Sequence, residues 1–312
     1  MPEVVICEFM YERAIRDELS GFDTFYDPTL VDRPDDLARL VSEARALVVR
    51  NRTQVRGGLL AAAAKLEAIG RLGVGLDNID MDACAARGVA VYPATGANDA
   101  AVAEYVIATA LMLLRGAYFA TPAVAAGDWP RNRLMGREIG GKALGLVGFG
   151  AIARETARRA ISLGLEIVAY DPHVPADHPA WTALGAPVAK LEFVDLLAVA
   201  DVVSLHVPLT PGTRNLVDAA ALARMKAGAI LINAARGGVV DEAALTRALR
   251  EGRLGGAALD VFSAEPVDAA AQALFRDCPN LILTPHIAGV TSESNVRVSH
   301  ATARAVARHL RR

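Results

Sequence analysis

A glycine-rich turn between an apolar segment and a helical pattern constrains the fold of this chain more than any other feature. The turn reads Gly148-x-Gly150-x-x-Ala153 and follows the apolar run 143–147 directly. A second apolar run, 167–170, is followed by the carboxylate of Asp171. This order of strand, glycine turn, helix, strand and acid is typical of a β-α-β unit that binds a dinucleotide.

Each residue type in this unit has a physical reason. Gly148 permits the tight turn, Gly150 lets backbone N–H groups approach a pyrophosphate, and Ala153 keeps the helix close to the strand. The pyrophosphate then lies at a helix N-terminus. Asp171 is placed to accept hydrogen bonds from ribose hydroxyls and repels a 2′-phosphate, so the sequence predicts NAD rather than NADP.

Short apolar runs alternate with helical patterns along the chain, and such runs suit strands that are buried on both faces of a parallel sheet. We expect an α/β protein with two Rossmann-like, doubly wound parallel-sheet domains and a cleft between them. The predicted substrate-binding domain comprises residues 1–97 plus 287–312, and the predicted NAD-binding domain comprises residues 98–286. The expected strands are 4–7, 46–49, 89–91, 144–147, 166–169, 202–205, 230–232, 257–259 and 281–283.

Composition excludes several classes of protein. The chain has 312 residues, is 53% hydrophobic and carries a net charge of −2, so neither a disordered protein nor a nucleic-acid-binding surface is expected. The most apolar segment, 100–114, contains Glu104 and is too short to span a membrane. Glu3 and Glu8 interrupt the N-terminal apolar run, which does not resemble a secretory signal and favours a cytoplasmic location. The three cysteines are scattered, so we expect no metal site.

Three further strings place chemically active side chains directly after apolar runs: 233–242 with Arg236, 259–266 with Asp260 and Glu265, and 284–289 with His286. The carboxyl ends of parallel strands share the sheet edge where ligands bind. Arg236 is suited to hold a carboxylate and polarise the C2 oxygen. His286 is suited to exchange the C2 hydroxyl proton, and Glu265 to favour its imidazolium form. Taken singly, each residue is more often structural; the hypothesis depends on the three together.

These strings together resemble the NAD-dependent D-2-hydroxyacid dehydrogenase family. The resemblance covers almost the whole chain and implies that Arg236, Glu265 and His286 are catalytic. It implies that the backbone at Val74 and Gly75 helps to hold the substrate carboxylate, and that Asp260 reaches the carboxamide of the nicotinamide. The helix that starts near Asn98 and the loop to Trp129 resemble the family's dimer arm, which favours a homodimer. The implied NAD contacts are Ala151, Ile152, Asp171, Ala234 and Asp260, with His206 to Pro208 near the adenine.

Arg50 and Arg52 follow the second expected strand and could meet one anion, because residues two apart on an extended strand face the same way. The 3-phosphoglycerate dehydrogenases are similarly basic at this position, and segments 5–10 and 51–55 resemble sulfolactate dehydrogenases. We therefore expect a small hydroxy acid or oxo acid substrate with a second anionic group. Two exposed charges at a strand end are an equally good interpretation.

Two other functions stay open at this point. Some proteins that resemble this family bind NAD and act as transcriptional corepressors with little turnover. An S-adenosylmethionine enzyme has a similar glycine-rich fold, although the Arg, Glu and His strings speak against it. The sequence does not decide which 2-hydroxy acid is used, the physiological direction or the oligomeric state.

Overall fold

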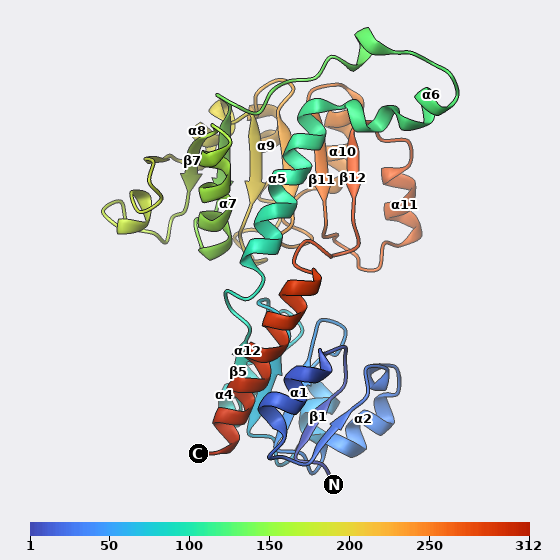
Figure 1. Cartoon of the computed structure of the whole chain (residues 1–312), viewed down its shortest axis with the longest axis vertical. Coiled ribbons are helices and arrows are strands. Elements are labelled where there is room, and N and C mark those ends of the chain that lie inside the picture. The colour runs from blue at the N-terminus through green and yellow to red at the C-terminus, as the bar shows by residue number, and fades with distance from the viewer. The chain divides into compact units, whose positions relative to one another are not determined.

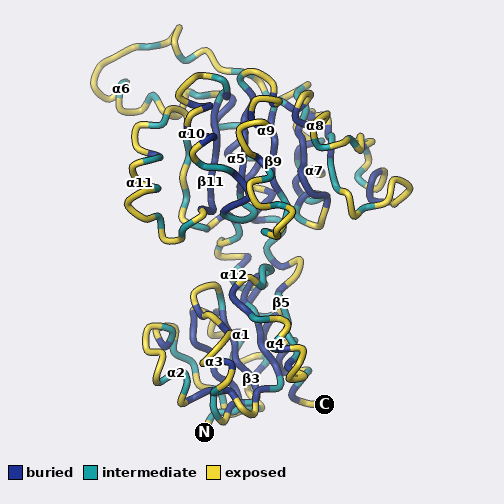
Figure 2. Tube along the Cα trace, turned by 180° about the vertical axis from the view of Figure 1, so that it is seen from behind, coloured by how far each residue is buried: buried dark blue, intermediate teal, exposed yellow.

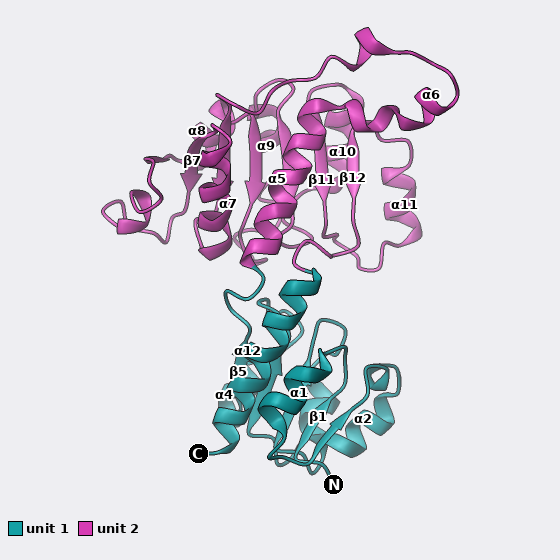
Figure 3. Ribbon diagram, viewed as in Figure 1, with its two compact units in different colours: residues 1–98, 290–312 teal, residues 99–289 magenta.

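The computed structural model describes all 312 residues and divides them into two compact units (Figure 3). Unit 1 comprises Met1–Asn98 and Val290–Arg312, and unit 2 comprises Asp99–Gly289. Each unit is an α/β layer structure around one parallel sheet, so the predicted class of two Rossmann-like parallel-sheet domains is confirmed.

Unit 1 contains a five-stranded sheet in the order β2-β1-β3-β4-β5. Helices α1 and α12 pack on one face of this sheet, and α2, α3 and α4 pack on the other. The chain thus leaves β1 toward β2 on one side and returns to β3 on the other, which creates a topological switch point between β1 and β3. The elements are β1 (Val4–Ile6), α1 (Glu12–Leu19), β2 (Thr24–Tyr26), η1 (Leu30–Asp32), α2 (Pro34–Val41), β3 (Ala46–Val49), α3 (Gly57–Ala62), β4 (Ala68–Arg71), α4 (Met81–Ala86), β5 (Ala90–Pro93) and α12 (Ser292–Leu310).

Unit 2 contains a seven-stranded sheet in the order β12-β11-β10-β9-β6-β7-β8. Helices α5 and α7 cover one face, and α8, α9, α10 and α11 cover the other. The switch point lies between β6 and β9, beside the glycine-rich turn. The elements are α5 (Asp99–Arg115), η2 (Ala117–Ala120), α6 (Thr121–Ala125), η3 (Arg131–Leu134), β6 (Ala143–Val147), α7 (Ala151–Ser162), β7 (Glu166–Tyr170), η4 (Pro179–Trp181), β8 (Val188–Lys190), α8 (Phe193–Val199), β9 (Val202–Leu205), α9 (Ala219–Arg224), β10 (Ile230–Asn233), α10 (Glu242–Arg250), β11 (Gly256–Leu259), α11 (Ala269–Phe275) and β12 (Leu281–Leu283).

Most of the strands inside each sheet are coloured as buried in Figure 2. Every residue of β3, β9, β10 and β11 is buried. Successive residues of a strand enter opposite cores: Val202 contributes to the core beneath α5 and α7, and Val203 to the core beneath α8 to α11. Burial on both faces explains why these strands are continuous apolar runs in the sequence.

No single helix has the length and apolar character needed to cross a membrane. Helix α5 and the helical residues 117–125 pass the test only when they are taken together, by length and composition, and the chain bends by 64° between them. Within unit 2, the segment that carries α6 projects away from the sheet (Figure 1).

Candidate active site

The glycine-rich turn follows β6, and its first position has no room for a side chain. Gly148 has φ of +91°, and a Cβ atom there would lie 2.5 Å from the carbonyl oxygen of His206. His206 itself donates its backbone N–H to Val147, which brings the end of β9 against the turn. The switch point between β6 and β9 therefore depends on this close backbone approach.

Gly150 is the N-cap residue of α7, and no side chain caps this helix. A Cβ atom at Gly150 would meet no protein atom within 4 Å, so the backbone faces open space there. Ala151 is exposed and Ile152 is half-buried at the start of the helix. The uncapped N–H groups and the helix dipole suit the phosphate groups of a dinucleotide.

Asp171 follows β7, and its carboxylate is hydrogen-bonded to the glycine-rich turn. One of its carboxylate oxygens accepts the N–H of Phe149 at 2.8 Å, and the other accepts the N–H of His173 at 2.9 Å. Its half-buried carboxylate places a negative charge beside the turn, where ribose hydroxyls can donate to the remaining lone pairs.

His206 and Pro208 follow β9 at the same edge. The Nε2 atom of His206 lies 3.0 Å from the hydroxyl oxygen of Ser204. Burial lowers the pKa of His206 to about 4, so its ring is neutral near pH 7. Pro208 is exposed. A neutral ring adds no positive charge to this side of the turn.

His286 and Glu265 form a direct hydrogen bond. The Nδ1 atom of His286 lies 2.8 Å from Oε2 of Glu265, and Oε1 of Glu265 accepts the N–H of Phe262 at 2.9 Å. Their side chains are 37% and 33% exposed, respectively, so the pair is fixed by the protein and still reachable by a small molecule. With Nδ1 directed at the carboxylate, Nε2 of His286 is the ring nitrogen left for a substrate.

The surroundings of Glu265 favour its ionised form. Partial burial alone would raise its pKa, but the hydrogen bonds from His286 and from the Phe262 N–H, with the charges of His286 and Arg236, hold this pKa below its usual range. An ionised Glu265 stabilises the protonated form of His286 when that form appears during a reaction.

Asp260 shapes the turn that carries His286. Its side chain is 1% exposed, and its two oxygens accept hydrogen bonds from the hydroxyl of Thr284 and from the N–H groups of Ile287 and Ala288. His286 has φ of +56°, in the left-handed region. The protein's own donors therefore occupy both oxygens of Asp260, a role that the sequence did not predict.

Arg236 and Ala234 lie in the loop after β10. Asn233 holds this loop, because its side chain donates to the carbonyl oxygen of Arg236 and accepts the N–H of Ala235. Arg236 donates to the carbonyl oxygen of Ala235 at 2.5 Å. Strands β10, β11 and β12 are neighbours in the sheet, so the structure brings the loops with Arg236, Glu265 and His286 to one edge of unit 2.

The two arginines predicted to bind a second anion lie in unit 1 and have different partners. Arg50 donates to Asn295 of α12 at 2.8 Å, and its guanidinium carbon lies 5.7 Å from the ring centroid of Phe9. Arg52 pairs with Asp32 at the surface. The expectation that both lie on an extended strand is wrong, because β3 ends at Val49 and the chain then bends through residues 51–53.

The loop after β4 carries Val74 and Gly75, which are both half-buried. Sequence reasoning did not single out Thr284 or Glu8 as site residues. A carboxylate directly after an apolar strand at a switch point was the available signal for Glu8.

The sequence of this chain matches a family of known enzymes. A family profile described as "D-isomer specific 2-hydroxyacid dehydrogenase, NAD binding domain" matches residues 107–288, which is more than half of the chain. The chain belongs to the D-isomer specific 2-hydroxyacid dehydrogenases. The family predicted from the motifs is confirmed, and so are the assignments of an oxidoreductase and of NAD as its cofactor.

Individual relatives of this dehydrogenase differ in what they are named for. It is 54% identical over 314 residues to the (S)-sulfolactate dehydrogenase of Chromohalobacter salexigens, with 99% of each chain covered. It is 39% identical over 309 residues to D-3-phosphoglycerate dehydrogenase 2 of Arabidopsis thaliana, where it covers 98% of its own length but 48% of the relative. A crystal structure of D-lactate dehydrogenase from Aquifex aeolicus, complexed with NAD and lactic acid, superposes with a TM-score of 0.84 at 26% identity, covering 99% of this chain and 95% of that one.

Proposed function

We propose that this dehydrogenase interconverts (S)-sulfolactate and its 2-oxo acid, using NAD. The observation that carries the proposal is the 54% identity to an (S)-sulfolactate dehydrogenase over 99% of both chains. The phosphoglycerate dehydrogenases, at 39% to 43% identity, make D-3-phosphoglycerate the second candidate. Both compounds carry a second anion beyond the carboxylate.

The configuration of sulfolactate agrees with a D-specific enzyme. The sulfomethyl carbon outranks the carboxylate carbon in the priority rules because it bears sulfur, whereas the phosphorylated carbon of 3-phosphoglycerate does not outrank it. The (S) label therefore describes the same spatial arrangement around C2 as the D form of 3-phosphoglycerate. One active site can present the C2 hydrogen of either compound in the same direction.

Three residues of unit 2 carry the proposed chemistry. Arg236 holds the substrate carboxylate and polarises the C2 oxygen. In the oxidising direction, Nε2 of His286 takes the proton of the C2 hydroxyl as the C2 hydrogen leaves with its electron pair, and Glu265 stabilises the resulting imidazolium. Bound NAD supplies the acceptor of that hydride. In the reducing direction, His286 returns the proton to the C2 oxygen.

The geometry of the turn supports the proposed cofactor contacts. Gly148 and Gly150 let the backbone and the N-terminus of α7, with Ala151 and Ile152, receive the pyrophosphate. Asp171 receives the ribose hydroxyls. We assign the remaining contacts to His206 and Pro208 near the adenine and to Ala234 and Asp260 near the nicotinamide.

We assign the substrate-binding role to residues 1–97 with 287–312 and the NAD-binding role to residues 98–286. In the first domain, the backbone at Val74 and Gly75 contributes to carboxylate binding. We assign the second anion to Arg50, whose guanidinium donates to the neutral side chain of Asn295, whereas Arg52 must first leave the carboxylate of Asp32.

We also propose a homodimer and a cytoplasmic location. The segment around α6 carries large apolar side chains that unit 2 leaves exposed, including Trp129 at 80% and Met135 at 84%. Exposed apolar patches of this kind mark interaction sites. Analytical ultracentrifugation tests the dimer, and a monomer at micromolar concentration would contradict it. A corepressor-like protein with little turnover is not favoured, since close relatives are named as enzymes.

A substrate panel tests the proposed function. We expect a kcat/KM for (S)-sulfolactate that exceeds that for D-glycerate, which has no second anion, by about 100-fold, the effect of two tenfold steps of about 1.4 kcal/mol each. D-3-Phosphoglycerate is measured alongside, and a preference for it would move the assignment to the phosphoglycerate class. Equal and poor turnover of all three acids would contradict a substrate with a second anion.

A further inference from the structure

The loop that carries Arg50 and Arg52 lies at the switch point of unit 1. In the order β2-β1-β3-β4-β5, strands β1 and β3 are neighbours whose following connections run to opposite sides. The segments after them begin with Cys7 and Arg50. In open α/β sheets this edge is where ligands bind, so the conformation of residues 50–53 decides what unit 1 can recognise.

Glu8 binds this loop through its backbone N–H groups. One carboxylate oxygen accepts from Arg50 at 2.8 Å and from Thr53 at 3.1 Å, and the other accepts from Arg52 at 3.1 Å. Glu8 is 4% exposed. A carboxylate is this deeply buried only when hydrogen bonds replace its water, and here three loop N–H groups do so.

Asn78 binds the carbonyl side of the same loop. Its side-chain nitrogen donates to the carbonyl oxygens of Arg50 at 3.2 Å and Thr53 at 2.7 Å, and the residue is 6% exposed. The carbonyl oxygen of Asn78 also accepts the N–H of Val55 at 2.8 Å. Asn78 belongs to the segment that follows Val74 and Gly75, so it links the arginine loop to the proposed carboxylate loop.

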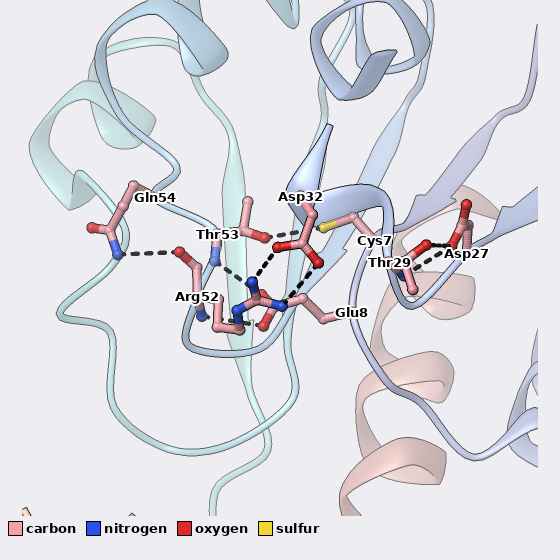
Figure 4. Close-up of polar contacts among 8 residues, drawn as sticks. All are labelled: Cys7, Glu8, Asp27, Thr29, Asp32, Arg52, Thr53 and Gln54. Atoms are coloured by element: carbon pink, nitrogen blue, oxygen red, sulfur yellow. Dashed lines mark hydrogen bonds and ion pairs between the residues drawn. The ribbon is translucent and has the colours of Figure 1, made fainter. Parts of the chain in front are cut away.

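The buried carboxylate of Glu8 also affects the protonation of Arg50. Burial lowers the pKa of Arg50, and the negative charge of Glu8 opposes that change. Arg52 is turned outward toward Asp32, while Thr53 points back to Cys7 with 3.3 Å between Oγ1 and Sγ (Figure 4). The two arginines thus leave one backbone turn in different directions, and Glu8 holds the amide group of each.

We infer that Glu8 is a positioning residue for substrate recognition: together with Asn78 it fixes loop 50–53 in the conformation that presents Arg50 to the second anion of the substrate. The inference rests on the proposed function for the identity of that anion. Glu8 makes no contact with the substrate and acts only through the loop.

Glu8→Gln tests this role because glutamine offers one acceptor oxygen and turns an NH₂ group toward a loop N–H. We expect KM for (S)-sulfolactate to rise about tenfold, equivalent to about 1.4 kcal/mol, with kcat within about twofold. KM for D-glycerate should stay unchanged, because D-glycerate has no second anion for Arg50 to bind. Glu43→Gln is the matched control, since Glu43 is an exposed acid of unit 1 that pairs with Lys65. Equal changes in KM for both acids, or none, would overturn the inference.

Limited trypsin digestion gives a second readout that needs no substrate. Arg50, Arg52 and Arg56 are trypsin sites within or beside the loop, and a fixed loop resists cleavage. Cleavage there, identified by mass spectrometry, should be faster in Glu8→Gln and Asn78→Ala than in the wild type and Glu43→Gln. Asn78→Ala carries the test if Glu8→Gln does not fold.

The two readouts separate the possible failures. If the wild type prefers D-glycerate, the proposed substrate is wrong, and the digestion still decides whether Glu8 fixes the loop. If all four proteins are cleaved at the same rate, Glu8 does not fix the loop whatever the substrate is.

Discussion

At the scale of single residues, the hydrogen bond between His286 and Glu265 is central to the proposed proton transfer. The carboxylate receives Nδ1 of the ring and the Phe262 N–H, and these contacts keep the pKa of Glu265 below its usual range. Glu265 is therefore ionised across the pH range in which histidines exchange protons. Its pairing weakens only in acid, as the pH falls through that lowered pKa.

Glu265→Gln removes this charge and keeps the size of the side chain. In the proposed mechanism, reduction of the oxo acid needs protonated His286, and a neutral partner stabilises the imidazolium less. The alkaline limb of the pH profile of kcat/KM for reduction should move to lower pH by about one unit, equivalent to about 1.4 kcal/mol. Glu242→Gln is the control, because Glu242 accepts the N–H of Ser263 in the same loop. An unshifted profile for Glu265→Gln would show that the carboxylate does not stabilise the acid form.

Sequence reasoning identified candidate residues here but not their contacts. Arg236, Glu265 and His286 could be proposed because each follows an apolar strand, and strand order places such loops at one edge. The three hydrogen-bond donors that hold the Asp260 carboxylate could not be proposed, because they depend on how the turn after Thr284 folds back on β11. The different partners of Arg50 and Arg52 could not be predicted either, because Asn295 and Asp32 lie close to them only in the folded chain.

At the scale of elements, the two glycines of the turn have different roles. Gly148 is required by the protein itself, since a Cβ atom there meets backbone 2.5 Å away. Gly150 has no protein atom within 4 Å of such a Cβ atom. The protein itself therefore leaves room for a side chain at Gly150, and only a bound ligand would exclude one there.

Gly150→Ala should leave the melting temperature nearly unchanged and weaken NAD binding by about tenfold or more, because the methyl group would lie where we propose that the pyrophosphate meets the backbone. Gly148→Ala should instead lower the melting temperature, since its φ of +91° and the contact with His206 both disfavour a side chain. Thermal unfolding and isothermal titration with NAD distinguish the two variants. Unchanged NAD affinity in Gly150→Ala would place the pyrophosphate elsewhere.

The strands that the sequence missed show where apolar patterns stop being informative. Strands β2 and β8 are short edge strands, and β4 contains Gly70 and Arg71 among its four residues. A Cβ atom at Gly70 would lie 2.7 Å from a methyl carbon of Thr302 in α12. Glycine is needed there for packing against a helix more than 200 residues away in sequence, which no local pattern reveals.

At the scale of the whole molecule, both units are open parallel sheets with a switch point, and the glycine turn and loop 50–53 lie at those points. Unit 2 has its glycine turn between β6 and β9, and unit 1 has loop 50–53 between β1 and β3. The alternation of apolar strands and helices was enough to predict this architecture, because burial on both faces leaves a continuous apolar signal.

The most direct test of the proposed chemistry is NADH absorbance during turnover of D-2-hydroxy acids, including (S)-sulfolactate, by the wild type and by His286→Ala. We predict turnover of a D-configured acid by the wild type and a loss of about 10²–10⁴-fold in kcat for His286→Ala, with NAD affinity retained. Undiminished turnover by His286→Ala would contradict the role of this histidine. No turnover of any acid by a wild type that binds NAD would contradict the dehydrogenase assignment and favour a regulatory protein.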